Sequence, residues 1–140
     1  MRLSHVIYKV KNLEEAVRHY TEQGYRVEYG SAKNPYNALI YFSQGAYIEL
    51  MAGTGMPAAA KKLLRLLGKG KFADRMDGWE NSPEGLCGAA IENDKANLNE
   101  EVRFLAGHGQ ACFGVNSRRN DTEGRKLRFK CAFPDEIQIP

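Results

Sequence analysis

The order of strand and helix patterns in the first 52 residues is the feature that most limits what this chain can fold into. Residues 3–10 alternate and are rich in β-branched side chains, which predicts a strand. Asn12 fits a helix N-cap with Glu15 three residues on, and the helix is expected to end at Gly24. Three more strands are predicted, at 25–29, 37–43 and 46–52. The order is therefore β-α-β-β-β.

A single unit of this kind leaves one sheet edge unpaired and one sheet face uncovered, so it needs a second unit. From Gly85 a similar pattern returns, with strands and a helix expected at 85–93, 94–109, 110–117 and 125–133. We therefore expect an α+β fold, a single domain over 1–140 in which two βαβββ units form a concave mixed sheet. The parts are a first unit at 1–52, a helical connector at 53–84 and a second unit at 85–140.

The second unit has no clear last strand, because the sequence reaches its end where that strand would begin, near Ile137. We expect that strand to be lost or supplied by another chain, and an open edge of this kind favours a homodimer. The connector carries an amphipathic, basic helix at 57–67. We expect this helix to pack through Leu63, Leu64, Leu66 and Leu67 and to expose its lysines, rather than to touch an anionic membrane surface.

Composition excludes several classes of protein. The chain has 140 residues, of which 43% are hydrophobic and 26% are charged, as in ordinary soluble domains. A net charge of +3 argues against a dedicated nucleic-acid binder. No apolar run approaches the ~20 residues of a membrane span. The cysteines at 87, 112 and 131 lack metal-site spacing, which predicts free thiols and a cytoplasmic location.

Glu49 is the most unusual residue of the first unit, because it places a carboxylate inside an apolar strand. Period-two alternation assigns Ala46, Ile48 and Leu50 to the helix side and Tyr47, Glu49 and Met51 to the concave side. The same alternation assigns His5 to the concave side. An imidazole and a carboxylate on one face can be two metal ligands, an acid–base pair, or a structural ion pair.

The segments "LSHVIYKVKNLEEAVRHYTEQGY" and "NALIYFSQGAYIELM", with the doubled element order, resemble the vicinal-oxygen-chelate superfamily. That superfamily contains glyoxalase I, bleomycin-resistance proteins and extradiol dioxygenases. The resemblance implies a concave sheet that cups a small molecule, often around a divalent metal (Mn, Fe, Ni or Zn). It also implies that His5 and Glu49 are metal ligands, and that Glu49 takes part in catalysis.

The second unit departs from this pattern. The resemblance puts Leu86, or at best Cys87, where a third ligand is expected, and only Glu136 precedes the expected last strand. In place of ligands the unit offers cations, which can bind carboxylate or phosphate groups. The candidate contacts for a small anionic ligand are Asn37, Tyr47, Arg118, Arg128 and Lys130, with Arg119 near the rim.

Three functions follow. The first is a metal-dependent glyoxalase-like lyase, isomerase or dioxygenase. The second is a metal-free protein of the same fold, with no cofactor, that sequesters or senses a small ligand. The third is an interaction module that uses the basic helix at 57–67. Fold alone does not decide between them.

Overall fold

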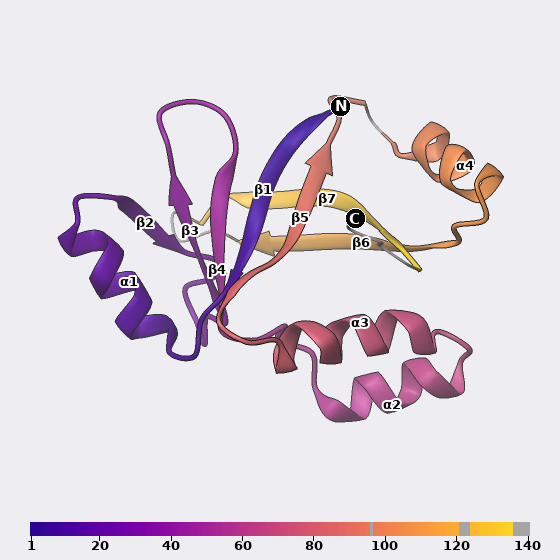
Figure 1. The fold of residues 1–140 in the computed structure, drawn as a ribbon, viewed down its shortest axis with the longest axis horizontal. Coiled ribbons are helices and arrows are strands. Elements are labelled where there is room, and N and C mark those ends of the chain that lie inside the picture. The colour runs from indigo at the N-terminus through magenta and orange to yellow at the C-terminus, as the bar shows by residue number, and fades with distance from the viewer. Residues whose placement is uncertain (96, 121–123, 136–140) are drawn as a thin grey trace.

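The computed structural model of the protein describes residues 1–95, 97–120 and 124–135. Its elements run along the chain as β1 (Arg2–Lys9), α1 (Leu13–Glu22), β2 (Arg26–Tyr29), β3 (Asn37–Tyr41), β4 (Tyr47–Met51), α2 (Ala58–Leu66), α3 (Gly70–Asn81), β5 (Gly85–Glu92), α4 (Asn99–Gly107), β6 (Cys112–Asn120) and β7 (Lys126–Pro134) (Figure 1). The α+β class predicted from the sequence is confirmed. Among the described residues, no helix is both long and apolar enough to cross a bilayer.

The main sheet has five strands in the order β2-β3-β4-β1-β5, and β6 and β7 form a separate two-stranded sheet. Strand β1 lies parallel to β4, and its other edge pairs with the antiparallel β5. The first strand of the second half therefore joins the sheet of the first half directly. The last strand expected near Ile137 lies outside the described residues.

Helix α1 covers one face of this sheet. Its start is fixed by Asn12, whose Oδ1 accepts hydrogen bonds from the backbone N–H groups of Glu14 and Glu15. The main core lies beneath it and consists of Val10, Leu13, Ala38, Ile40 and Leu50, with Tyr8, Val17 and Ile48 packed around them. The helix side predicted from alternation is thus confirmed for Ile48 and Leu50.

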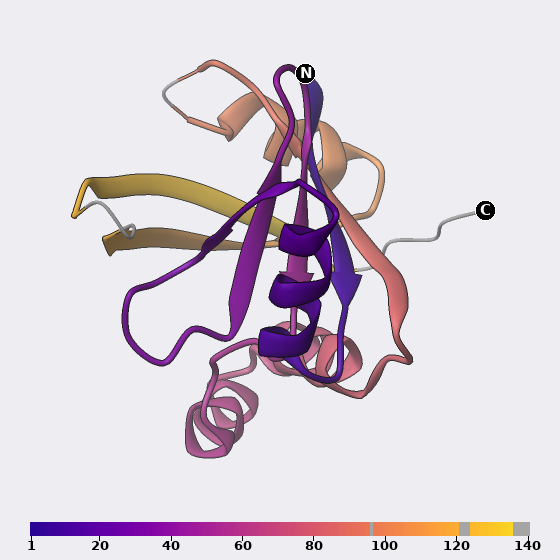
Figure 2. The ribbon, with the colours of Figure 1, turned by 90° about the vertical axis from the view of Figure 1, so that its left-hand side faces the viewer.

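The opposite face is partly covered by α3 and by the β6–β7 hairpin. Figure 2 shows α1 in front of the sheet and the hairpin behind it. Three apolar side chains of β1, β3 and β4 are buried on this concave side, Ile7, Leu39 and Met51. The ring of Phe72 in α3 packs against both Phe113 and Phe133 of the hairpin, at centroid distances of 4.4 and 4.9 Å. The connector and the hairpin therefore meet through an aromatic cluster, while β5 joins the second unit to the sheet of the first.

The connector is a pair of helices, and α2 packs in the reverse of the expected orientation. Lys61 is buried against α3 and forms ion pairs with Asp77, at 2.7 Å, and with Glu80. Leu63, Leu66 and Leu67 are exposed. The expectation that the leucines pack inward is wrong for these three, whereas Leu64 is half-buried. Two carboxylates of α3 hold Lys61 on the inner side of α2 instead.

Two boundaries in the second half also differ from the expectation. Helix α4 begins at Asn99 and not at Asp94, where the expected helix starts; Asp94 pairs with Arg2 at 2.9 Å. Strand β6 continues to Asn120 and so includes Arg118, which was expected in a loop. Pairing with β7 continues to Asn120, so strand β6 extends beyond residue 117, where the local sequence predicts its end.

Candidate functional site

The candidate site is built on the concave side of β1, β4 and β3. The parallel register places His5 opposite Tyr47 and Ile7 opposite Glu49, so Glu49 lies diagonal to His5 on the same face. His5 Nε2 lies 3.2 Å from Glu49 Oε2, and the two side chains are 17% and 18% exposed. The structure thus brings together the two residues that alternation assigned to one face.

Asn37, from β3, holds the other carboxylate oxygen of Glu49. Its Nδ2 donates a hydrogen bond of 2.6 Å to Glu49 Oε1. The glycine at position 30 makes room for this amide, because a Cβ there would overlap Asn37 Oδ1 and Cγ. Gly30 was not singled out by the sequence, since its role depends on the β2–β3 pairing. Glu49 is therefore oriented from two sides.

This arrangement predicts that Gly30→Ala displaces the Asn37 side chain and breaks its hydrogen bond to Glu49. We expect a loss of about 1–3 kcal/mol in the free energy of unfolding, as for other overpacked sites. Urea unfolding measures it. In an Asn37→Ala background the same substitution should cost little, because the nearest atoms that the new methyl meets belong to Asn37. Equal costs in both backgrounds would contradict this geometry.

Aromatic rings fix the imidazole of His5. The His5 ring stacks on Tyr47 with centroids 4.6 Å apart and planes 18° from parallel, and Tyr41 lies against Tyr47 at 5.6 Å. On the other ring nitrogen, His5 Nδ1 lies 3.2 Å from Ser4 Oγ. An imidazole that is stacked, and that has a polar partner near each nitrogen, has a defined orientation toward any molecule above it.

Three further residues border the site: Lys9, which alternation in the first strand assigns to the concave side, Cys87, which the resemblance put at best at a third ligand position, and Cys131, which sequence reasoning did not place there. Lys9 is buried on the concave side and donates a 2.6 Å hydrogen bond from Nζ to the carbonyl oxygen of Ala52. Burial raises the pKa of the Cys87 and Cys131 thiols, and the negative charge of Glu49 raises both further. Both cysteines are therefore neutral thiols at pH 7. They line the site as weakly polar side chains and are not activated nucleophiles.

Cys87 reaches this position through an irregularity in β5. Tyr8 pairs with Leu86 and Ile7 pairs with Gly88, so Cys87 is an extra residue between two successive pairs. Such β-bulges re-aim side chains and are common beside functional sites. A second irregularity falls between Leu3 and His5, next to the imidazole. The two shifts thus flank the site along β1.

A model of the glyoxalase-like domain family matches residues 3–140 of the chain. The chain belongs to this family. Neither the curated proteins nor the solved structures give a significant match. Because the match spans both halves of the chain, the resemblance noted for the first half extends to the second. The family gives a fold and a superfamily, but no ligand, reaction or metal dependence.

The cationic residues expected at the site of this glyoxalase-like domain lie elsewhere. Arg118 pairs across the hairpin with Arg128, and Asn116 pairs with Lys130, so these side chains share one face. Phe133 and Cys131 occupy the opposite face, which points toward Trp79 and Glu49. Arg118, Arg128 and Lys130 are therefore exposed on the outer face, and the structure does not bring them to His5 and Glu49. Alternation separates the two faces of β7 correctly, but the face that carries Arg128 and Lys130 points away from the site.

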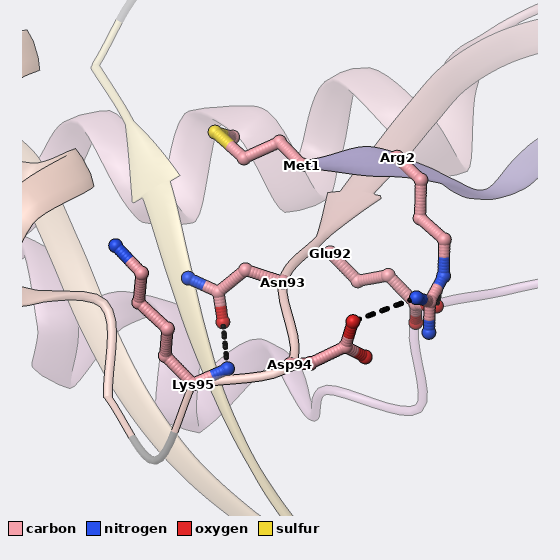
Figure 3. Close-up of a pocket in the computed structure, with 6 residues that line it drawn as sticks. All are labelled: Met1, Arg2, Glu92, Asn93, Asp94 and Lys95. Atoms are coloured by element: carbon pink, nitrogen blue, oxygen red, sulfur yellow. Dashed lines mark hydrogen bonds and ion pairs between the residues drawn. The ribbon is translucent and has the colours of Figure 1, made fainter.

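Two surface pockets of the glyoxalase-like domain lie away from the concave face. Figure 3 shows the first, lined by Met1, Arg2, Glu92, Asn93, Asp94 and Lys95. It is held by exposed ion pairs from Arg2 to Glu92 and Asp94, which contribute little to stability. The second lies beside the start of α1 and includes Asn12, Tyr29 and Pro35. Neither contains His5 or Glu49, so neither changes the choice of site.

The donor groups in the described residues do not complete a metal centre. His5 and Glu49 offer one imidazole and one carboxylate, whereas catalytic zinc sites typically use three protein ligands. Leu86 has no donor atom, and the Cys87 thiol would first have to lose its proton. Within residues 1–95, 97–120 and 124–135, no group of three or more His, Cys, Asp or Glu side chains could hold a metal ion. Glu136 lies outside these ranges.

Proposed function

We propose that the concave face of this glyoxalase-like domain binds a small molecule beside His5 and Glu49, without requiring a metal. The observation that carries the proposal is the half-buried His5–Glu49 pair at 3.2 Å, which Asn37 orients from the far side of the carboxylate. A half-buried carboxylate and imidazole are costly to maintain, and groups of this kind recur at ligand sites.

The chemistry available to the pair is binding and proton transfer. An imidazole within 3.2 Å of a carboxylate can accept or donate a proton, while the carboxylate stabilises the charged ring. Tyr47 supports the ring from one side and offers a flat aromatic surface to a ligand. In this proposal Glu49 and His5 touch the ligand, Asn37 is a positioning residue, and Tyr47 is a contact surface.

The sequence predicts a small anionic ligand. The proposed ligand is still a small molecule, but it does not carry a negative charge. The three cations that favoured an anionic ligand face outward on the hairpin, and Lys9 is engaged with the Ala52 carbonyl. The charged group that meets a ligand on the concave face is then Glu49. A polar, neutral or cationic molecule with a planar part fits these groups better than an anion does.

The test is saturation-transfer NMR with a library of neutral, anionic and cationic aromatic fragments, recorded in excess chelator. We expect a set of fragments that bind the wild type, bind Glu28→Gln equally, and lose most of their signal with Glu49→Gln. Glu28 is a matched control, since its register places it on the same sheet face, with a 19% exposed side chain paired to Arg26. Equal binding to all three proteins would contradict the proposal.

A second candidate is metal-dependent chemistry, which is favoured by the ligand types of His5 and Glu49. These two residues would hold a divalent cation, which supplies Lewis-acid polarisation of a bound oxygen when present. Calorimetric titration of chelator-treated protein with Mn²⁺, Ni²⁺ and Zn²⁺ separates the candidates. The metal-free proposal expects no saturable binding that depends on Glu49. One-site binding that disappears in Glu49→Gln would make the metal-dependent candidate the better one.

A further inference from the structure

The outer side of helix α2 carries a group of leucine side chains that are exposed to solvent. Leu63, Leu66 and Leu67 are 56%, 84% and 65% exposed. Together with Ala59 they fall at spacings of three and four residues and share one side of the helix. A contiguous group of exposed leucines is a candidate interaction surface.

The polar side of α2 is held inward by a set of ion pairs, so the leucine side is fixed outward. Lys61 contacts Asp77 and Glu80, and Arg65 contacts Asp74 at 2.7 Å and Asp77 at 2.5 Å. Thr54 adds a 2.5 Å hydrogen bond from its hydroxyl to Glu80. Figures 1 and 2 place α2 at the periphery of the molecule, outside α3. Turning the leucines inward would require breaking all of these contacts.

The charges around the leucine side indicate which kind of partner surface it can bind. Residues 57–69 contain no Asp or Glu, and their exposed cations include Lys62 and Lys69. Lys62 makes no ion pair among the described residues, and Lys69 lies over the Phe113 ring at 5.5 Å. Two copies of α2 packed face to face would bring lysines together without a carboxylate between them.

We propose that the outer side of α2 docks the protein peripherally on an anionic lipid bilayer. The leucines enter the boundary between headgroups and acyl chains, while Lys62 contacts the anionic headgroups, as in other amphipathic helices at membrane surfaces. This surface is separate from the concave site, so the proposal does not depend on what that site binds.

Co-sedimentation with vesicles tests the proposal. We expect the full chain to bind vesicles of phosphatidylcholine with 30 mol% phosphatidylglycerol, and to bind pure phosphatidylcholine weakly. Leu63→Ser with Leu66→Ser should abolish binding, and Lys62→Gln should weaken it about fivefold. Leu86→Ser is the control, because Leu86 is 74% exposed on β5 and should leave binding unchanged. Equal binding to both vesicle types, or no binding to either, would overturn the proposal.

Sedimentation velocity without lipid tests whether a second copy of the chain occupies this surface. A dimer that the double serine variant dissociates would assign the leucine side to a second copy and overturn the bilayer proposal. If the serine variant fails to fold, as judged by circular dichroism, the wild type decides the question. Its vesicle binding should then fall steeply between 0.05 and 0.5 M NaCl, because screening weakens lysine contacts with headgroups. Binding that does not respond to salt would overturn the proposal.

Discussion

Replacing Leu50 by alanine should lower the free energy of unfolding by about 2–5 kcal/mol. Leu50 is fully buried between α1 and the sheet, and it packs in the core with Val10, Ala38 and Ile40. Truncation removes apolar contacts and leaves a cavity, which adds to the lost transfer free energy. Urea unfolding at pH 7, followed by circular dichroism, measures the change.

Leu66→Ala is the matched control for this prediction. It makes the same substitution at a leucine that is 84% exposed on α2, so its expected effect is within about 0.5 kcal/mol of zero. A Leu66→Ala cost as large as that of Leu50→Ala would mean that the leucine side of α2 is buried in the protein in solution. It would then contradict both the packing of α2 and the bilayer proposal.

Acid should loosen the α2–α3 pair, and Lys61→Met should remove most of that sensitivity. The hydrogen bond from Lys61 lowers the pKa of Asp77, with help from Arg65, and the pKa of Glu80, with help from Thr54. Both pKa values are lower in the folded than in the unfolded protein. Their stabilising contribution is therefore present above the ordinary carboxyl range and is lost as pH falls below about 4.

Urea unfolding at pH 7, 5 and 3 measures this prediction. The wild type should lose stability mainly between pH 5 and 3, whereas Lys61→Met should be less stable at pH 7 and change less with acid. Lys62→Met is the control, because Lys62 is exposed and is expected to leave the pH dependence unchanged. Parallel curves for the wild type and Lys61→Met would mean that Lys61 does not hold the two carboxylates.

The first half of the chain could be predicted because its local patterns agree with its tertiary contacts. Alternation in β1 and β4 and the parallel pairing between them place His5 and Glu49 on one side of the sheet. The cap at Asn12 and the apolar stripe of α1 determine which side of the sheet is covered. Each inference used a period that the backbone geometry imposes.

The rest of the site depends on contacts that leave no local signal. The hydrogen bond between Asn37 and Glu49 requires the register of β3 against β4, and the place of Cys87 requires a bulge in β5. The orientation of α2 was decided by Asp77 and Glu80, which lie 16 and 19 residues after Lys61. Periodicity identified the two sides of α2 and of β7, but it could not say which side faces the protein.

The three histidines of the chain allow the most direct test of the concave site. His5 lies in the site, while His19 is on α1 and His108 follows α4. Proton–carbon NMR of the histidine rings should be followed while a fragment that binds the wild type is added. The proposal predicts that the His5 ring signals move saturably and that those of His19 and His108 stay in place. Movement of His19 or His108 signals with His5 unchanged would contradict a ligand site on the concave face.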